Sequence, residues 1–315
     1  MMGGRSSFAD RPRNGGGARA RKARKITLAH DTTVQQGFSV IMRIGVHHLV
    51  SNQNAVLNGG GIECLHQMRV ALRRLNAALT LFADVIASPR ARRIGDDLKW
   101  LGSVLGRARD WDVFATGSLK TARRDGTAKL AYESVEQAAS AQRLVAHRRV
   151  ERAIDSARYR SFIRAMNSWL SDDQWRQGVE PDIGAVLEEP LAEVSRAWLR
   201  RSARKVRKAG KHVRHLTPKK RHRLRIAAKQ LRYDSDSLAS LYAAKRVRRY
   251  LSALRNLQDV LGDLNDLAVA RRLVRVAKRR DRSAVDARLA MAAERRLKAL
   301  RPAWRAFREV RSFWD

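Results

Sequence analysis

The chain has 315 residues, 66 of them Lys or Arg and 30 Asp or Glu, which gives a formal net charge of +36. Such an excess of one sign repels itself, so we expect a polyanionic partner: nucleic acid, polyphosphate or an anionic membrane surface. The single cysteine, Cys64, excludes an intrachain disulfide, and charged residues interrupt every apolar run before it could span a membrane. The N-terminus has no apolar stretch typical of a secretory signal, so a cytoplasmic location is predicted.

Residues 1–30 are rich in Gly and Arg and contain almost no large apolar residue before Ile26. This composition predicts a disordered segment. The segment fits either a linker that follows another domain or a basic arm that attracts anions without specificity.

Hydrophobic spacing predicts four helices in residues 31–157. The first begins at Asp31 as its N-cap and runs to about Leu57, where a run of glycines follows. The second ends near residue 88, and the third begins near residue 90 and should kink around Gly102 or Gly106. The fourth covers about residues 127–156. The apolar face of the second helix recurs in steps of three and four, at Leu65, Met68, Leu72, Leu75, Leu79 and Phe82.

A connector of about residues 158–189 follows, with a short helix near 158–170 and then scattered Gly and Pro. Four further helices are predicted in residues 190–315: about 191–208, one that starts at Thr217-Pro218, about 245–277 and about 283–313. No segment shows sustained alternation of apolar and polar residues, so we expect an all-α fold.

The two halves repeat each other with an offset of 156 residues. His66-Gln67-Met68-Arg69-Val70-Ala71 falls on His222-Arg223-Leu224-Arg225-Ile226-Ala227, and the same offset aligns residues 98–110 with residues 254–266. A shared offset over two motifs indicates one domain built from two repeats, of about residues 31–157 and 190–315, rather than a solenoid.

Cationic residues lie beside the apolar face in both repeats. His66, Arg69, Arg73 and Asn76 follow helical steps, as do His222, Arg225, Lys229 and Arg232, so each set shares one face of a helix. Residues 196–232 contain sixteen Lys or Arg and no acid, which predicts a binding face that includes Arg200, Arg204 and Arg207. A row of fixed cations suits a long anion.

The remaining candidate residues do not point to catalysis or to a metal. His212 and His215 have a helical spacing for metal ligands, but no carboxylate lies near them to balance a divalent ion. Of the neighbours His47 and His48, at most one can reach the core. Asp110, Asp112 and Asp266 have arginines nearby in the sequence, so we expect them to be ionised and to orient those arginines. We therefore predict a protein that is not an enzyme and has no cofactor.

These motifs closely resemble the CHAD family, the conserved histidine α-helical domain. The resemblance covers residues 31–315 and rests on the paired His motifs, Lys-Gln-Leu-Arg-Tyr at 229–233 and Leu-Gly-Arg-Ala-Arg-Asp-Trp-Asp-Val at 105–113. It implies two four-helix bundles related by a pseudo-twofold axis, with a basic central groove that binds inorganic polyphosphate. It also implies an association with polyphosphate granules or polyhydroxyalkanoate granules.

Carried over by position, the resemblance implies ligand contacts from both repeats: His66, Arg69, Arg73, Arg74, His222, Arg225, Lys229 and Arg232, extended by Lys99, Arg107 and Arg255. Asn76 replaces an arginine of the family. In the second repeat, Asp263 and Asn265 occupy the positions that correspond to Arg107 and Arg109, which predicts an asymmetric site. Many relatives carry an upstream CYTH triphosphatase domain with a Glu-x-Glu-x-Lys motif, which this chain lacks.

Two other functions fit the composition less well. An RNA- or DNA-binding helical protein would place aromatic residues among its cations for base stacking, and residues 196–232 contain only Trp198. Nucleic acid should therefore bind only unspecifically. An accessory domain of a triphosphatase remains the other alternative, although a hydrolase itself would need a carboxylate cluster for Mg²⁺, and none stands out.

Overall fold

The computed structural model describes residues 19–119, 129–177 and 180–315. The first repeat contains α1 (Val34–Val50), α2 (Gln53–Leu57), α3 (Gly61–Leu81), α4 (Pro89–Val113) and α6 (Lys129–Ile154). The connector contains α7 (Ala157–Leu170) and α8 (Pro181–Glu188). The second repeat contains α9 (Leu191–Ala209), α10 (Pro218–Leu238), α11 (Ala244–Leu273), α12 (Arg279–Leu297) and α13 (Leu300–Glu309).

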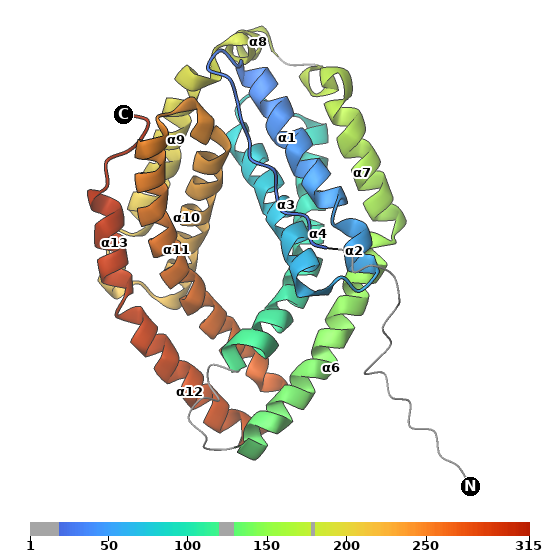
Figure 1. The fold of residues 1–315 in the computed structure, drawn as a ribbon, viewed down its shortest axis with the longest axis vertical. Coiled ribbons are helices and arrows are strands. Elements are labelled where there is room, and N and C mark those ends of the chain that lie inside the picture. Colours follow the sequence, from blue (N-terminus) through green and yellow to red (C-terminus); the bar gives the residue numbers. More distant parts are fainter. Residues whose placement is uncertain (1–18, 120–128, 178–179) are drawn as a thin grey trace.

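The prediction of an all-α fold is confirmed, because no strand occurs in the part of the chain that the structure describes. Helices α9, α10 and α11 begin within one residue of the positions that the 156-residue offset predicts from the starts of α1, α3 and α4. In Figure 1 the first repeat and the second repeat form opposite sides of the molecule, with α3 and α4 facing α10 and α11 across the middle. Helices α6 and α12 contact each other at one end.

One hydrophobic core runs through both repeats. Equivalent positions are buried in each, as in the pair Met68 and Leu224 and the pair Leu75 and Leu231. A smaller apolar cluster lies where α6, α12 and the end of α11 meet. Because α3 and α10 bury their apolar faces in this core, the cationic positions beside those faces are held in place.

Several helix boundaries differ from the prediction. Thr33, not Asp31, caps α1. The Thr33 side chain accepts a hydrogen bond from the Gln36 backbone amide, and the Gln36 side-chain oxygen accepts one from the Thr33 backbone amide. The first helix ends at Val50 and not at Leu57. Gly102 and Gly106 lie within the continuous helix α4, and the irregular segment is instead the π-helical turn Phe114–Ser118.

The expected single last helix is also wrong, since it is divided into α12 and α13. Pro302 has no amide hydrogen, and its ring would clash with the carbonyl group four residues earlier in a continued α12. The first turn of α13 accommodates Pro302, and α13 then buries Leu300, Ala303, Trp304 and Phe307.

Residues 19–30, which we call the strap, correct a further prediction. They were expected to be disordered, but they form an extended segment that runs past α3 to the start of α1, and Ile26 and Leu28 are buried. Burial of these two side chains, two residues apart on an extended chain, holds the strap against the core. Residues 1–18 lie outside the described residues, so the prediction for them stays a prediction.

Candidate polyanion-binding groove

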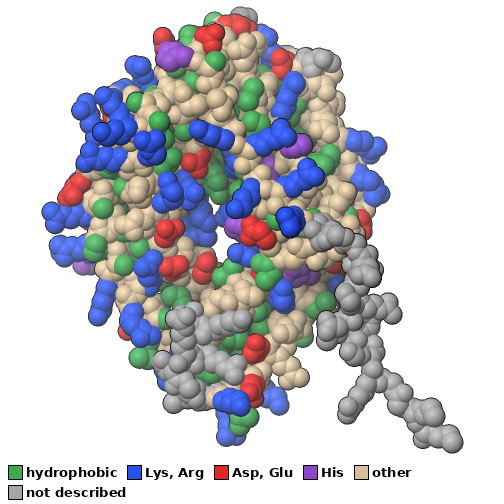
Figure 2. Space-filling model, in the orientation of Figure 1, with side chains coloured by type: hydrophobic (Ala, Val, Ile, Leu, Met, Phe, Trp, Pro, Cys, Tyr) green, Lys and Arg blue, Asp and Glu red, His purple; other side chains and the backbone are tan. Residues whose placement is uncertain are grey.

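The central groove consists of three adjoining cavities between the repeats, with volumes of about 840, 150 and 340 Å³. Arg73 of α3 and Arg225 and Lys229 of α10 line all three. Figure 2 shows basic side chains around a hollow in the middle of this face, with acidic side chains along its lower rim. The groove thus unites cations from both repeats, and their positions are related by the 156-residue offset.

Helix spacing and close packing place the cations. Arg69 and Arg73 are one turn apart on α3, as Arg225 and Lys229 are on α10, so each pair projects from one face. Arg69 also lies close to α4, where its Nη1 is 3.4 Å from the Gly102 carbonyl oxygen. A β-carbon on Gly106 would be 2.9 Å from the same Nη1, so a glycine at this position leaves room for the guanidinium.

The groove cations are partly removed from water and close to like charges. Burial, followed by the charge of Arg73, lowers the pKa of Arg69 to about 10. Burial, followed by Arg225 and Arg73, lowers the pKa of Lys229 to about 7. Because the negative charge of an anion in the groove would stabilise the charged forms of both side chains, the site is electrostatically suited to bind one.

Two residues that line the groove have a buried donor without a partner. Within the described part of the chain, the Nε atoms of Arg73 and Arg225 are shielded from solvent and have no hydrogen-bond partner. A buried donor without a partner costs free energy, so native proteins rarely keep one without a reason. By the 156-residue offset Arg225 corresponds to Arg69, one helical turn before Arg73, and both Arg73 and Arg225 line all three cavities.

Acidic residues make the two sides of the groove unequal. Asp236 lies 3.5 Å from Arg232, and Asp263 lies 2.8 Å from Arg296, while Asp259 and Asp266 also line the largest cavity. Cations still outnumber acids in this lining. The acids come from α10 and α11, so the second repeat carries the weaker side of the groove.

Asp110 and Asp112 pair with arginines as expected, but their partners are not the arginines next to them in the sequence. Asp110 pairs with Arg272 at 3.8 Å, but burial raises its pKa. Asp112 is fully buried and accepts hydrogen bonds from Arg143 at 2.7 Å and His147 at 2.9 Å, both on α6. Its partners are therefore residues far along the chain and not the neighbouring arginines, because the tight packing of α4 on α6 brings them together.

The structure brings together most of the predicted site residues. His66 lines two of the three cavities, and Arg74 and Arg232 line the largest. Lys99 lines the cavity of about 340 Å³ and forms an ion pair with Asp96. His222 is exposed and lines none of the three cavities, although its Nδ1 lies 3.1 Å from the side-chain oxygen of Asn265, which lines the smallest one.

Other predicted residues lie elsewhere. Arg107 lines a neighbouring hollow of about 490 Å³ beside Trp111. Arg255 and the α9 residues Arg200, Arg204 and Arg207 are exposed and line none of these cavities. Arg200 pairs instead with Asp315.

Three basic residues of the groove were missed: Arg24 and Lys25 of the strap and Arg109 of α4. The apolar residues Ile26 and Leu28 beside the two strap cations were the available signal for an ordered segment, and the low overall hydrophobicity of residues 1–30 obscured it.

Among the described residues, no group of three or more His, Cys, Asp or Glu side chains is arranged to hold a metal ion. No helix in the same residues is long and apolar enough to span a membrane. As predicted for the pair of neighbouring histidines, His48 is buried and His47 is exposed.

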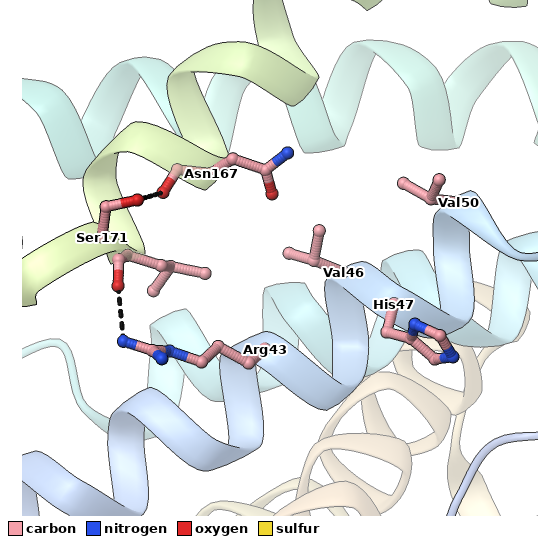
Figure 3. Close-up of a pocket in the computed structure, with 7 residues that line it drawn as sticks. Arg43, Val46, His47, Val50, Asn167 and Ser171 are labelled. Atoms are coloured by element: carbon pink, nitrogen blue, oxygen red, sulfur yellow. Dashed lines mark hydrogen bonds between the residues drawn. The ribbon is translucent and has the colours of Figure 1, made fainter.

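A separate hollow of about 610 Å³ lies between α1 and α7 and is shown in Figure 3. Its one guanidinium, that of Arg43, donates a hydrogen bond to the Leu170 carbonyl oxygen at 2.7 Å. Val46 and Val50 form much of the rest of its wall. Because the Arg43 guanidinium is already hydrogen-bonded to the backbone, this hollow lacks the cluster of cations that lines the central groove.

Comparison with known proteins supports the resemblance seen in the sequence. The crystal structure of the CHAD domain from the plant Ricinus communis has a TM-score of 0.76 and 31% identity, covering 93% of this chain and 97% of that one. PptA from Streptomyces chartreusis shares the fold, with a TM-score of 0.60 and 15% identity over 89% of this chain and 99% of its own.

Two curated relatives are the uncharacterized proteins MT2285 and Rv2226 of Mycobacterium tuberculosis, strains CDC 1551 / Oshkosh and ATCC 25618 / H37Rv. Each is 26% identical over 247 residues, which is 72% of this chain but 44% of the relative. The family model of the CHAD domain matches residues 41–275. The chain therefore belongs to the CHAD family.

Proposed function

We propose that the central groove binds inorganic polyphosphate and that the chain is not itself an enzyme. The observation that carries the proposal is the pair of buried, unpartnered Nε donors of Arg73 and Arg225, which point to a missing acceptor shared by both repeats. Polyphosphate is a linear row of charges, and a row of Arg and Lys side chains needs only to match its spacing.

The lining of the groove favours this anion over nucleic acid. Its aromatic residues are Tyr233 and the buried Phe114, so it offers few surfaces on which bases could stack. Proteins that hold single-stranded nucleic acid combine cations with several such surfaces. Nucleic acid should bind only through general electrostatics.

The acids in the groove support binding without hydrolysis. Asp110 pairs with Arg272, and Asp263 pairs with Arg296, so these carboxylates are engaged in neutralising arginines. A metal-dependent hydrolase would direct several carboxylates at one divalent ion. In a cytoplasmic protein, such a groove would hold the chain on polyphosphate granules, or on polyhydroxyalkanoate granules that carry the polymer. It would also present polyphosphate to a CYTH triphosphatase domain in relatives that contain one.

The direct test is a competition experiment. Labelled long-chain polyphosphate bound to the protein is challenged with single-stranded RNA at equal phosphate concentration and about 150 mM salt. We expect the polyphosphate to resist displacement. Replacing Arg73 and Arg225 together by Ala should weaken its binding at least about 100-fold, because each change removes charge-assisted contacts worth about 1.5–3 kcal/mol.

The matched control is Arg301→Ala/Arg308→Ala, which removes the same charge from exposed positions on α13 outside the groove. This variant should bind polyphosphate within about twofold of the wild-type affinity, since screening limits the influence of distant charges. Equal losses in the two double variants, or equal displacement by RNA, would refute a shaped polyphosphate site.

A further inference from the structure

The strap is fastened to both repeats. At one end, the Asn52 side chain accepts a hydrogen bond from the Arg21 amide and donates one to the Arg21 carbonyl oxygen, each at 2.9 Å. At the other end, the Leu28 amide donates to the Ser240 hydroxyl at 2.8 Å, and that hydroxyl lies 3.3 Å from the Leu28 carbonyl oxygen. Since Asn52 belongs to the first repeat and Ser240 to the second, the strap spans the space between them.

Between these two attachments the strap forms a wall of the groove. Residues 23–26 line the largest cavity, which Arg225 and Lys229 of α10 also line. The side chains of Arg24 and Lys25 are exposed, while Ile26 is buried and fixes the backbone beside them. The exposed cations therefore stand at a defined place, which is unlike the random positions of charges on a disordered arm.

Placing two more positive charges beside Arg73, Arg74 and Arg225 is unfavourable in the free protein. Like charges around one cavity raise the free energy of the folded chain, and an anion between them lowers it. The adjacent Ile26 and Leu28 hold the strap in place despite this repulsion. The largest cavity is therefore lined by helices of both repeats and, in addition, by the strap.

We propose that the strap is a specific part of the polyphosphate site, in which Arg24 and Lys25 contact the polymer directly and the two attachments close the strap over it. This inference rests on the proposed function of the groove. It assigns ligand contacts to a segment that precedes both repeats, and it predicts that affinity depends on the strap's position as well as on its charge.

The test compares two double variants of the same segment. Arg24→Ala/Lys25→Ala removes the cations that line the cavity, and Arg19→Ala/Lys22→Ala removes the same charge from exposed strap residues that do not line it. We expect the first variant to bind polyphosphate about tenfold more weakly at about 150 mM salt, and its logarithmic salt slope to fall in magnitude by about 1.4, for two lost phosphate contacts. The second variant should stay within about twofold of wild type.

Proteolysis gives an independent measurement on the unaltered chain. Trypsin cuts after Arg and Lys, so bound polyphosphate should slow cleavage after Arg24 and Lys25 more than cleavage after Arg19 and Lys22. Ser240→Ala, which keeps every charge, should speed both dissociation of the polymer and cleavage of the strap, because it removes one attachment.

Equal loss of affinity in the two double variants, or no loss in either, would overturn the inference, as would uniform protection along the strap. The two double variants Arg73→Ala/Arg225→Ala and Arg24→Ala/Lys25→Ala distinguish a failure of the proposed function from a failure of the proposed role of the strap. If Arg73→Ala/Arg225→Ala still binds polyphosphate, the groove assignment fails. If that variant loses binding while Arg24→Ala/Lys25→Ala behaves like its control, only the role of the strap fails.

Discussion

Lys229 is positioned to gain or lose a proton near neutral pH. Its pKa of about 7 reflects burial first and then the charges of Arg225, Arg73 and Arg69, partly offset by Asp266. Bound polyphosphate favours the charged amine, so binding takes up a proton wherever Lys229 is neutral in the free protein. We expect the affinity for polyphosphate to fall as pH rises from 7 to 9, by up to about tenfold per pH unit, and calorimetry in two buffers to measure the proton uptake.

The control for this effect is Lys229→Arg, which keeps the charge and should flatten the profile above pH 7. An unchanged slope in that variant would assign the proton to another group. Burial, followed by Arg109 and Arg73, lowers the pKa of His66 from its usual 6.5, so His66 is mostly neutral in the free protein at pH 7.

The lowered pKa of Lys229 also makes the stability of the folded chain depend on pH. Between about pH 7 and the ordinary lysine pKa of 10.5, the unfolded chain holds the proton of Lys229 more strongly than the folded chain does. The contribution of Lys229 to the free energy of unfolding therefore increases with pH in that window and is smallest below pH 7.

At the scale of helices, Asp112 joins α4 to α6. Burial acts to raise its pKa, but hydrogen bonds from His147 and Arg143 outweigh burial and lower it. This stabilisation is present above the unfolded pKa near 3.8 and is lost as pH falls through the lower folded value. Asp112→Ala should reduce the free energy of unfolding by about 1.5–3 kcal/mol at pH 7, measured by urea denaturation.

A matched comparison is available on the same helix. Asp97 of α4 pairs with Arg158 of α7 at 2.8 Å, but both side chains are partly exposed to solvent. Asp97→Ala should change the free energy of unfolding by less than about 1 kcal/mol. Similar losses in the two variants would show that burial of Asp112 does not set its contribution.

Helices with a regular apolar face could be predicted from the sequence, whereas their interruptions could not. The steps of three and four through Met68, Leu72 and Leu75 identify α3 because burial of that face is a local property of the helix. The break after Val50 is different. Asn52 turns its side chain to the Arg21 backbone, a partner 31 residues away, and spacing along one helix carries no information about that contact.

The composition of the groove also depended on long-range packing. The offset of 156 residues correctly pairs Arg69 with Arg225, and Arg73 with Lys229, in one cavity system. The acid-free run of residues 196–232 did not show which of its cations faces the cavity. Helix α9 buries Trp198, Leu199 and Val206, and this leaves Arg204 and Arg207 exposed outside the groove.

For the whole molecule, a net charge of +36 opposes the compact state. We expect the midpoint of thermal unfolding to rise by about 5 °C between about 20 and 300 mM NaCl, because screening weakens this repulsion. Calorimetry over a salt series measures the change. A midpoint that falls with salt would mean that attractive pairs, such as that of Asp112 and Arg143, outweigh the repulsion.

Contacts between the repeats are reciprocal in a way that bears on the origin of the chain. The Arg73 guanidinium lies 6.0 Å from the centre of the Tyr233 ring, and Gln230 donates a hydrogen bond to the Ala77 carbonyl oxygen at 3.0 Å. By the 156-residue offset, Tyr233 corresponds to Ala77, and Gln230 corresponds to the neighbour of Arg73. Adjacent positions, 73 and 74 in the numbering of the first repeat, thus meet position 77 of the other repeat in the two directions, which resembles the arrangement of an isologous homodimer.

We infer that a single ancestral repeat once formed this groove by pairing with a second copy of itself. In such a dimer every substitution would have altered both walls at once. Fusion of the two copies into one chain released that constraint, so the two walls could differ, as they do where Asp263 lines the groove while its counterpart Arg107 lies outside it.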